Sequence, residues 1–197
     1  MILYDLSYYI RIYHTRPGDR FAYLWKSAGD QVLRVGLWDP RRDQRAGPVS
    51  PLFDVTIQDP QNLGAIIRNA VCFGCAGIVL PKRRSAGISP GAMKASSGAL
   101  AHCPVAQIAN LGVAVERLKE KGFIIYGADA SPESESLSQA RFDFPLGLML
   151  GNEFQGIMPT LKKSCDKLIH IPQESRVASL NVSSASAILL YSLTRPR

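Results

Sequence analysis

Polar and glycine residues gather in three short clusters, each of which follows an apolar segment with the character of a strand. The first is Asn62-Leu63-Gly64 with Arg68, the second is Leu150-Gly151-Asn152-Glu153-Phe154-Gln155-Gly156, and the third is Ser179-Leu180-Asn181-Val182-Ser183, downstream of Ile171-Pro172. Open α/β sheets bind ligands at the carboxyl ends of their strands, so such clusters are suited to holding a small molecule. They equally suit structural roles, because Asn and Ser cap helices and glycine-flanked carboxylates occur in plain turns.

Several common chemistries find little support in the residue pattern. No G-x-G-x-x-G opens the first helix, and no G-x-x-x-x-G-K-[ST] is present for a nucleoside triphosphate. A serine hydrolase needs a positioned histidine, and His14, His102 and His170 stand near no suitable partners. Cys72 and Cys75 form a lone C-x-x-C without a second pair at zinc-ribbon spacing. We therefore interpret them as buried reduced thiols and expect no metal site.

Composition indicates a folded protein with an anionic partner. The chain has 197 residues, of which 46% are hydrophobic and 20% charged, enough for one sizeable core plus an appendage. No apolar run approaches the roughly 20 residues that cross a bilayer, and the N-terminus lacks a basic leader, so we expect a cytoplasmic protein without a membrane partner. The net charge of +7 and the pI near 9.4 favour a polyanion such as RNA.

Strands and helices alternate along most of the chain. Residues 1–50 are aromatic and Arg-rich and are interpreted as an N-terminal extension with two short strands, near 21–24 and 31–37. Residues 51–197 form the main domain, which is predicted to be α/β with a mostly parallel sheet flanked by helices. Its predicted strands are 52–57, 78–81, 105–108, 123–126, 146–150 and 168–171, and its predicted helices begin near 62, 90, 111, 159 and 185. The helix that begins near Pro90 is predicted to extend to Leu100.

Taken together, the order N-x-G-x-x-x-R, L-G-N-E-x-x-G and I-P…S-L-N-V-S resembles the three motifs of the SpoU/TrmH branch of the SPOUT methyltransferases, from about Val55 to Leu193. Residues 79–86, 96–99 and 104–105 are most similar to the subgroup that modifies a guanosine of 23S ribosomal RNA. The resemblance implies transfer of a methyl group from S-adenosylmethionine to a ribose 2′-hydroxyl of RNA. It also implies a C-terminal trefoil knot and a homodimer that pairs through the knots.

The resemblance assigns roles to residues by position. Gly151, Ile171 and Leu180 are expected to hold S-adenosylmethionine. The catalytic neighbourhood is expected to comprise Asn62, Arg68, Glu153, Ser179 and Asn181. A guanidinium is a poor proton acceptor, so we expect Arg68 to clamp an RNA phosphate and stabilise the developing oxyanion, leaving the proton to phosphate or water. The RNA-binding residues are expected to be Lys82, Arg83, Arg84 and Lys94.

Departures from the family pattern keep two alternatives open. Related enzymes usually carry glycine in place of Phe154 and Ser175 and an acid in place of Ser192, and residues 1–50 are too short to complete the usual L30e-like RNA-binding domain. Phe154 and Ser175 border the cofactor loops, where either residue would narrow the pocket or alter backbone angles that glycine permits. The alternatives are a transfer RNA ribose as substrate, and an RNA-binding homologue that has lost turnover.

Overall fold

The chain folds into two compact units, Met1–Arg45 and Ala46–Arg197. The computed structural model describes residues 9–13, 21–26, 32–38, 49–54, 57–83, 85–103, 105–152, 155–174 and 179–194. In the first unit, β1 (Tyr9–Tyr13), β2 (Phe21–Lys26) and β3 (Val32–Trp38) form an antiparallel sheet in that order. The two predicted strands are confirmed, whereas β1 was not predicted. That the unit binds RNA stays a prediction.

The second unit contains a seven-stranded sheet in which every neighbouring pair is parallel. Its order is β6-β5-β4-β9-β7-β10-β8. The strands are β4 (Val49–Asp54), β5 (Ile78–Pro81), β6 (Val105–Ile108), β7 (Ile124–Ala128), β8 (Glu135–Ser136), β9 (Leu146–Leu150) and β10 (Lys167–His170). The predicted α/β fold with a parallel sheet is confirmed, and β8 is an additional short strand. The trefoil knot stays a prediction.

The sheet order places β4 and β9 at its centre. From β4 the chain runs outward through β5 to β6, then returns to β7, and β9 is inserted between β4 and β7. All five residues of β9 are buried, as expected for a parallel strand covered on both faces. Connections leave β4 and β9 in opposite directions, and such a switch point at the carboxyl edge is where open α/β sheets bind ligands.

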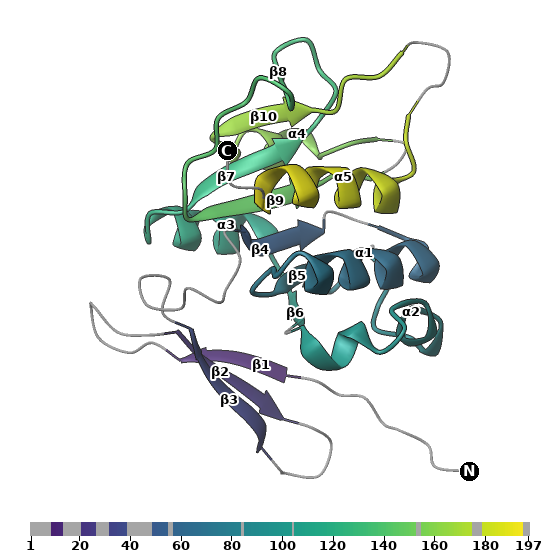
Figure 1. The fold of residues 1–197 in the computed structure, drawn as a ribbon. Coiled ribbons are helices and arrows are strands. Elements are labelled where there is room, and N and C mark those ends of the chain that lie inside the picture. Colours follow the sequence, from purple (N-terminus) through teal and green to yellow (C-terminus); the bar gives the residue numbers. More distant parts are fainter. Residues whose placement is uncertain are drawn as a thin grey trace. The chain divides into compact units, whose positions relative to one another are not determined.

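Two long helices lie side by side on one face of this sheet, α1 (Pro60–Cys72) and α5 (Val182–Thr194) (Figure 1). The side chain of Asp59 caps α1 by accepting a hydrogen bond from the Gln61 amide, so Asn62 is not the cap that it resembled in the sequence. On the other side, α3 (Leu111–Lys119) packs against β5, β7 and the short α4 (Pro159–Lys162). Both faces of the sheet are thereby covered.

The helix predicted from Pro90 to Leu100 is interrupted. α2 covers only Pro90–Ala95, and after a turn a short 3-10 helix, η1, covers Ala99–His102. The turn contains two residues with positive φ, Ser97 at 49° and Gly98 at 85°. This left-handed geometry cannot continue a right-handed helix, so the helix ends there.

Cys75 and Cys103 are buried free thiols, whereas Cys72 is not buried. Burial is the main cause that raises the pKa of Cys75 and Cys103 to about 12, so both remain protonated, as buried thiols should. Cys72 is exposed, which corrects the interpretation of that residue as buried.

Within the described ranges, the structure has no helix with the length and apolar character that crossing a membrane requires.

Gly64 allows α1 and α2 to approach closely. A Cβ atom at this position would lie 2.4 Å from the Ala95 Cβ and 2.6 Å from the Ala92 carbonyl oxygen. We predict that Gly64→Ala lowers the free energy of unfolding by about 1–3 kcal/mol in urea titrations, because α1 must move away from α2. Gly87→Ala is the matched control, since its Cβ would meet only Gln107 Nε2 at 3.8 Å. Equal stabilities of the two variants would contradict the close approach.

Candidate functional site

The second cluster and Ile171, which precedes the third cluster, emerge at one edge of the sheet. Ala128, the last residue of β7, lies opposite Leu150 of β9 and also opposite Ile169 of β10. Gly151 and Ile171 therefore follow their strands at a similar height on either side of β7. Two strand spacings place them roughly 10 Å apart. The end of β4 is in the same register, with Asp54 opposite Leu150, so α1 also begins from this edge.

A direct hydrogen bond joins the first cluster to the third. Asn181 Nδ2 donates to Asn62 Oδ1 at 3.0 Å, across 119 residues of sequence. The oxygen of the Asn181 side chain accepts from the Ser183 amide at 2.8 Å and from the Ser183 hydroxyl. Asn181 thus caps α5 with one end of its amide and contacts α1 with the other. The structural and functional interpretations of this residue are both compatible with the geometry.

A second asparagine of α1, which the sequence analysis did not single out, strengthens this connection. Asn69 Nδ2 donates to the Ser183 carbonyl oxygen and to Ser186 Oγ, both at 2.9 Å. Ser186 is completely buried and also donates to the Ser183 carbonyl oxygen at 2.7 Å. Asn62 and Asn69 are seven residues apart, so they occupy one face of α1. The sequence shows this seven-residue spacing of the two asparagines, but their shared role becomes visible only when α5 is placed against that face of α1.

Arg68 occupies a different face of α1. Its Nη1 donates to Ser97 Oγ at 3.4 Å, on the turn that follows α2. Among the described residues this is the single hydrogen bond of the Arg68 side chain, and no ion pair with them is found. The structure therefore brings Asn62 and Asn181 together but connects Arg68 to Ser97 instead. The guanidinium charge is not offset by a described carboxylate.

The glycines of the second cluster are required by a tight turn. Asn152 and Gly156 exchange two backbone hydrogen bonds of 3.0 and 2.8 Å, and Gly156 has a φ of 65°. A Cβ on Gly151 would lie 2.4 Å from the Gly156 carbonyl carbon, so the returning limb of the turn occupies that space. Glu153 and Phe154 lie outside the described residues.

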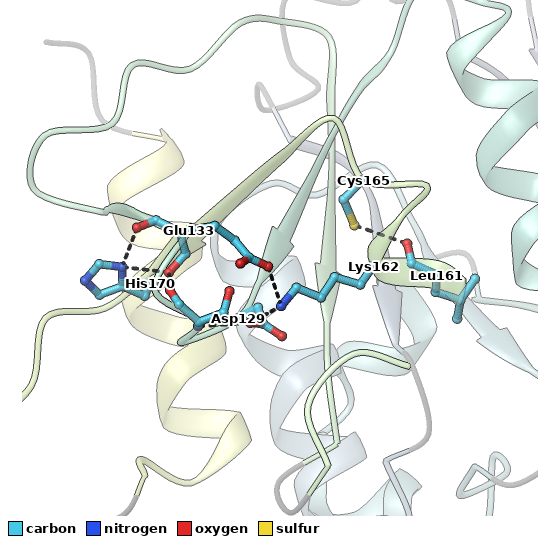
Figure 2. A network of polar contacts seen from close by, with 8 residues as sticks. Asp129, Glu133, Leu161, Lys162, Cys165 and His170 are labelled. Carbon is cyan, nitrogen blue, oxygen red and sulfur yellow. Dashed lines mark hydrogen bonds and ion pairs between the residues drawn. The ribbon is translucent and has the colours of Figure 1, made fainter. Parts of the chain in front are cut away.

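Next to this turn lies a polar network that the sequence analysis did not predict (Figure 2). Asp129, directly after β7, accepts from the Ser131 amide and pairs with Lys162 of α4, both at 3.0 Å. Lys162 also pairs with Glu133 at 3.0 Å. A Cβ on Gly156 would lie 3.5 Å from Asp129 Oδ2, so the carboxylate lies against the turn. The network therefore connects the end of β7 to both the turn and α4.

Opposing effects set the ionisation of Asp129. Burial raises the pKa of its carboxyl group, but the hydrogen bonds from Ser131 and Lys162 outweigh burial, so the net pKa is lowered. Hydrogen bonds to Glu133 and Asp129 raise the pKa of Lys162. Because the carboxyl pKa is lowered on folding, the stabilisation is present above the ordinary aspartate range and is lost as the pH falls through the lowered pKa.

Ile171 and Leu180 are the other two residues expected to hold the cofactor. Ile171 and Leu180 are half-buried, and Ser179 is exposed. Ile171 also packs against the hydrophobic core, so its position is fixed by the sheet. Ile171 directly follows β10, and a partly accessible aliphatic side chain at the end of a strand is suited to one face of a flat ligand ring. Ser175 lies outside the described residues.

Three of the four basic residues expected to contact RNA are exposed. Lys82 and Arg83 follow β5, and Lys94 lies in the last turn of α2. Arg84 lies outside the described residues. The Lys82 backbone amide donates to the Ile108 carbonyl oxygen at 2.8 Å, which fixes the start of this basic loop against β6. In the described part of the chain, no group of His, Cys, Asp and Glu side chains is arranged to hold a metal ion.

A family model and a curated relative match most of this chain. The model of the SpoU rRNA Methylase family matches residues 52–191. A curated relative from Synechocystis, described as an uncharacterised tRNA/rRNA methyltransferase, is 48% identical over 161 residues. The aligned region covers 82% of this chain but 41% of that relative. The chain thus spans about two fifths of the relative's length.

Solved structures show the same fold. A putative RNA methyltransferase of the TrmH family from Porphyromonas gingivalis has a TM-score of 0.68 and 31% identity, covering 75% of this chain and 59% of its own. An rRNA methyltransferase from Sinorhizobium meliloti, with S-adenosylmethionine bound, has a TM-score of 0.68 and 28% identity, with coverage of 79% and 59%. Both likenesses agree with the parallel sheet described above.

The contact between α1 and α5 gives a pH-dependent prediction. Asn69→Asp replaces a donating amide with a carboxylate that faces the Ser183 carbonyl oxygen. At pH 7 we expect the free energy of unfolding to fall by about 1–3 kcal/mol in urea titrations, because a part-buried acceptor is left facing a charge. Folding raises the pKa of the introduced carboxyl group, so the penalty shrinks as the pH falls through that pKa.

Asn110→Asp is the matched control for this change. Its side-chain oxygen accepts from the Val113 amide at 3.3 Å and caps α3, a role that a carboxylate also performs. We expect this variant to be as stable as the wild type or slightly more so at pH 7. A similar loss in both variants, or a loss from Asn69→Asp that does not change with pH, would contradict the donor role of Asn69.

Proposed function

Because the chain belongs to the SpoU rRNA Methylase family, we propose that it transfers a methyl group from S-adenosylmethionine to a ribose 2′-hydroxyl of RNA. We propose a guanosine of 23S ribosomal RNA as the substrate. The observation that carries this proposal is the Asn181–Asn62 hydrogen bond, which joins the family's first and third motifs in one folded unit. Arg68 lies on the same helix as Asn62, at a spacing of six residues.

The residues present fit the cofactor. Gly151 and Ile171 flank the end of β7, and the half-buried Ile171 and Leu180 offer apolar contact to an adenine ring, with backbone groups for its polar edge. S-adenosylmethionine supplies a methyl group activated by its sulfonium. The protein's contribution is to hold this donor and a ribose hydroxyl in line, because positioning dominates such a displacement.

The other residues bind and orient the RNA. Arg68 clamps the phosphate beside the reacting ribose and stabilises the developing oxyanion. Guanidinium groups stay protonated in proteins, so the hydroxyl proton passes to phosphate or water. The Asn62–Asn181 pair fixes α1, the helix that carries Arg68, against the start of α5. Ser179 lines the reacting pocket, and Glu153 fixes backbone or ribose groups. Lys82, Arg83, Arg84 and Lys94 contact phosphates farther along the RNA.

We propose a cytoplasmic homodimer that pairs through the C-terminal part of the second unit. Ile188 and Tyr191 of α5 are 38% and 43% exposed. The Tyr191 ring stacks edge-to-face on Phe73, just beyond α1, with centroids 6.1 Å apart. An exposed aromatic and aliphatic patch on the two helices that carry the first and third motifs is suited to a second copy of the chain.

A transfer RNA ribose is the alternative substrate. The description of the Synechocystis relative as a tRNA/rRNA methyltransferase favours keeping it. The two substrates would use the same chemistry at Arg68, so the distinction rests on RNA contacts away from the reacting ribose.

We predict that Arg68→Ala lowers methylation of RNA by about 10²–10³-fold, because a donor aimed at the developing charge is lost. Calorimetry should show S-adenosylmethionine binding with unchanged affinity. Arg117→Ala is the matched control, since Arg117 is an exposed arginine of α3. Turnover by Arg68→Ala equal to that of the wild type would remove Arg68 from the mechanism.

The substrate is tested by mapping ribose methylation in RNA from cells with and without the protein. We expect one guanosine of 23S ribosomal RNA to lose its methyl group when the protein is absent. Loss confined to a transfer RNA would support the alternative. No change in either RNA, together with no binding of S-adenosylmethionine at millimolar concentration, would identify a homologue that has lost turnover.

A further inference from the structure

Ser97 adopts a backbone conformation that serine rarely accepts. Its φ of 49° is the one positive value at a non-glycine residue within the described ranges. Side chains with a Cβ atom are disfavoured in this left-handed region, where glycine or asparagine would fit with less strain. Such residues persist where their surroundings hold them, and they concentrate at functional sites. The strain therefore raises the question of what the Ser97 hydroxyl does.

The surroundings of Ser97 fix the turn to α1. Ser96 is completely buried, and its hydroxyl donates to the Met93 carbonyl oxygen at 2.8 Å. The Ala99 amide donates to the Ser96 carbonyl oxygen at 3.0 Å. A Cβ on Gly64 would lie 2.9 Å from the Ser96 amide nitrogen, so α1 touches the backbone at this point. The turn cannot move without disturbing the packing between α1 and α2.

This fixed turn places the Ser97 hydroxyl beside Arg68. Gly64 and Arg68 are four residues apart and thus share the face of α1 that meets the turn. Arg68 Nη1 donates to Ser97 Oγ at 3.4 Å. We propose that Ser97 is a positioning residue that holds the Arg68 guanidinium in the orientation that receives the RNA phosphate. This inference rests on the role of Arg68 in the proposed function.

The chemistry of the contact suits this task. Ser97 is neutral, so it orients the guanidinium without offsetting its charge, whereas Lys119, Lys162 and Lys167 are each paired with carboxylates within 3.0 Å. A distance of 3.4 Å is long for a hydrogen bond, and such contacts in free enzymes tighten when substrate binds. No described atom lies within 4 Å of a Cβ on Gly98, so the next residue of the turn faces open space.

Three substitutions at Ser97 separate the effect of losing its hydroxyl from the effect of its strained backbone conformation. Ser97→Gly removes the hydroxyl and relieves the strain, so its melting temperature should equal or exceed that of the wild type. Ser97→Ala removes the hydroxyl and keeps the strain. We expect both to lower kcat by on the order of 10-fold, with KM for S-adenosylmethionine unchanged, because a hydrogen bond to a charged group is lost. Ser97→Asn, which tolerates positive φ and supplies an acceptor, should recover most of the activity.

Two comparisons distinguish positioning from a structural role. In an Arg68→Ala background, Ser97→Gly should lower the residual kcat by less than about 2-fold, since both residues act through one contact. An equal loss in both backgrounds, or full activity of Ser97→Gly in the wild-type background, would overturn the proposal. Ser184→Ala, an exposed serine of α5, is the control and should keep wild-type kcat.

A spectroscopic readout keeps the inference testable if the proposed function fails. The side-chain guanidinium signals of Arg68, assigned with Arg68→Lys, report the contact in the free protein by NMR. We expect Ser97→Gly and Ser97→Ala to shift these signals and Ser184→Ala to leave them unchanged. Unchanged signals in all three variants would overturn the contact itself. Absence of methyl transfer by the wild type would instead overturn the proposed function.

Discussion

The site depends on the polar contact between α1 and α5. Asn69 is matched to two acceptors near the start of α5, and one of them, the Ser186 hydroxyl, is completely buried. Sliding one helix along the other by a turn would leave these groups unpaired in a place that water cannot reach. A single register therefore satisfies them. That register sets where Asn181 lies relative to Asn62, although 119 residues separate the two in sequence.

The regular elements of the second unit could be predicted because their signals are local. The strands Ile78–Pro81, Val105–Ile108 and Leu146–Leu150 are apolar runs bounded by turn residues, and they occur where the sequence places them. Alternation with helical spacing then requires parallel pairing, since each crossover returns the chain to the same edge. Clusters after such strands must meet at that edge. This reasoning reaches the location of the site but not its contacts.

The contacts could not be predicted, because each depends on partners far away in sequence. Asn69 looks like an ordinary polar residue of a helix until Ser186 is placed beside it, 117 residues away. Asp129 connects the end of β7 to α4 through its ion pair with Lys162, and nothing in the sequence indicates that these two residues pair. The end of α2 at Ala95 was missed for another reason, since Ser97 adopts a conformation that its residue type disfavours. Local propensity fails where tertiary packing imposes strain.

The spacing of the first motif now has a physical explanation. Residues seven or four positions apart on an α-helix lie on the same side of it. Asn62 therefore shares one face of α1 with Asn69, and Gly64 shares another face with Arg68. Asn62 and Gly64, two positions apart, point in nearly opposite directions. One face meets α5 through amides, and the other meets the turn after α2 through a missing Cβ and a guanidinium. Helix α1 therefore fixes the Asn62–Asn181 pair and Arg68 relative to each other.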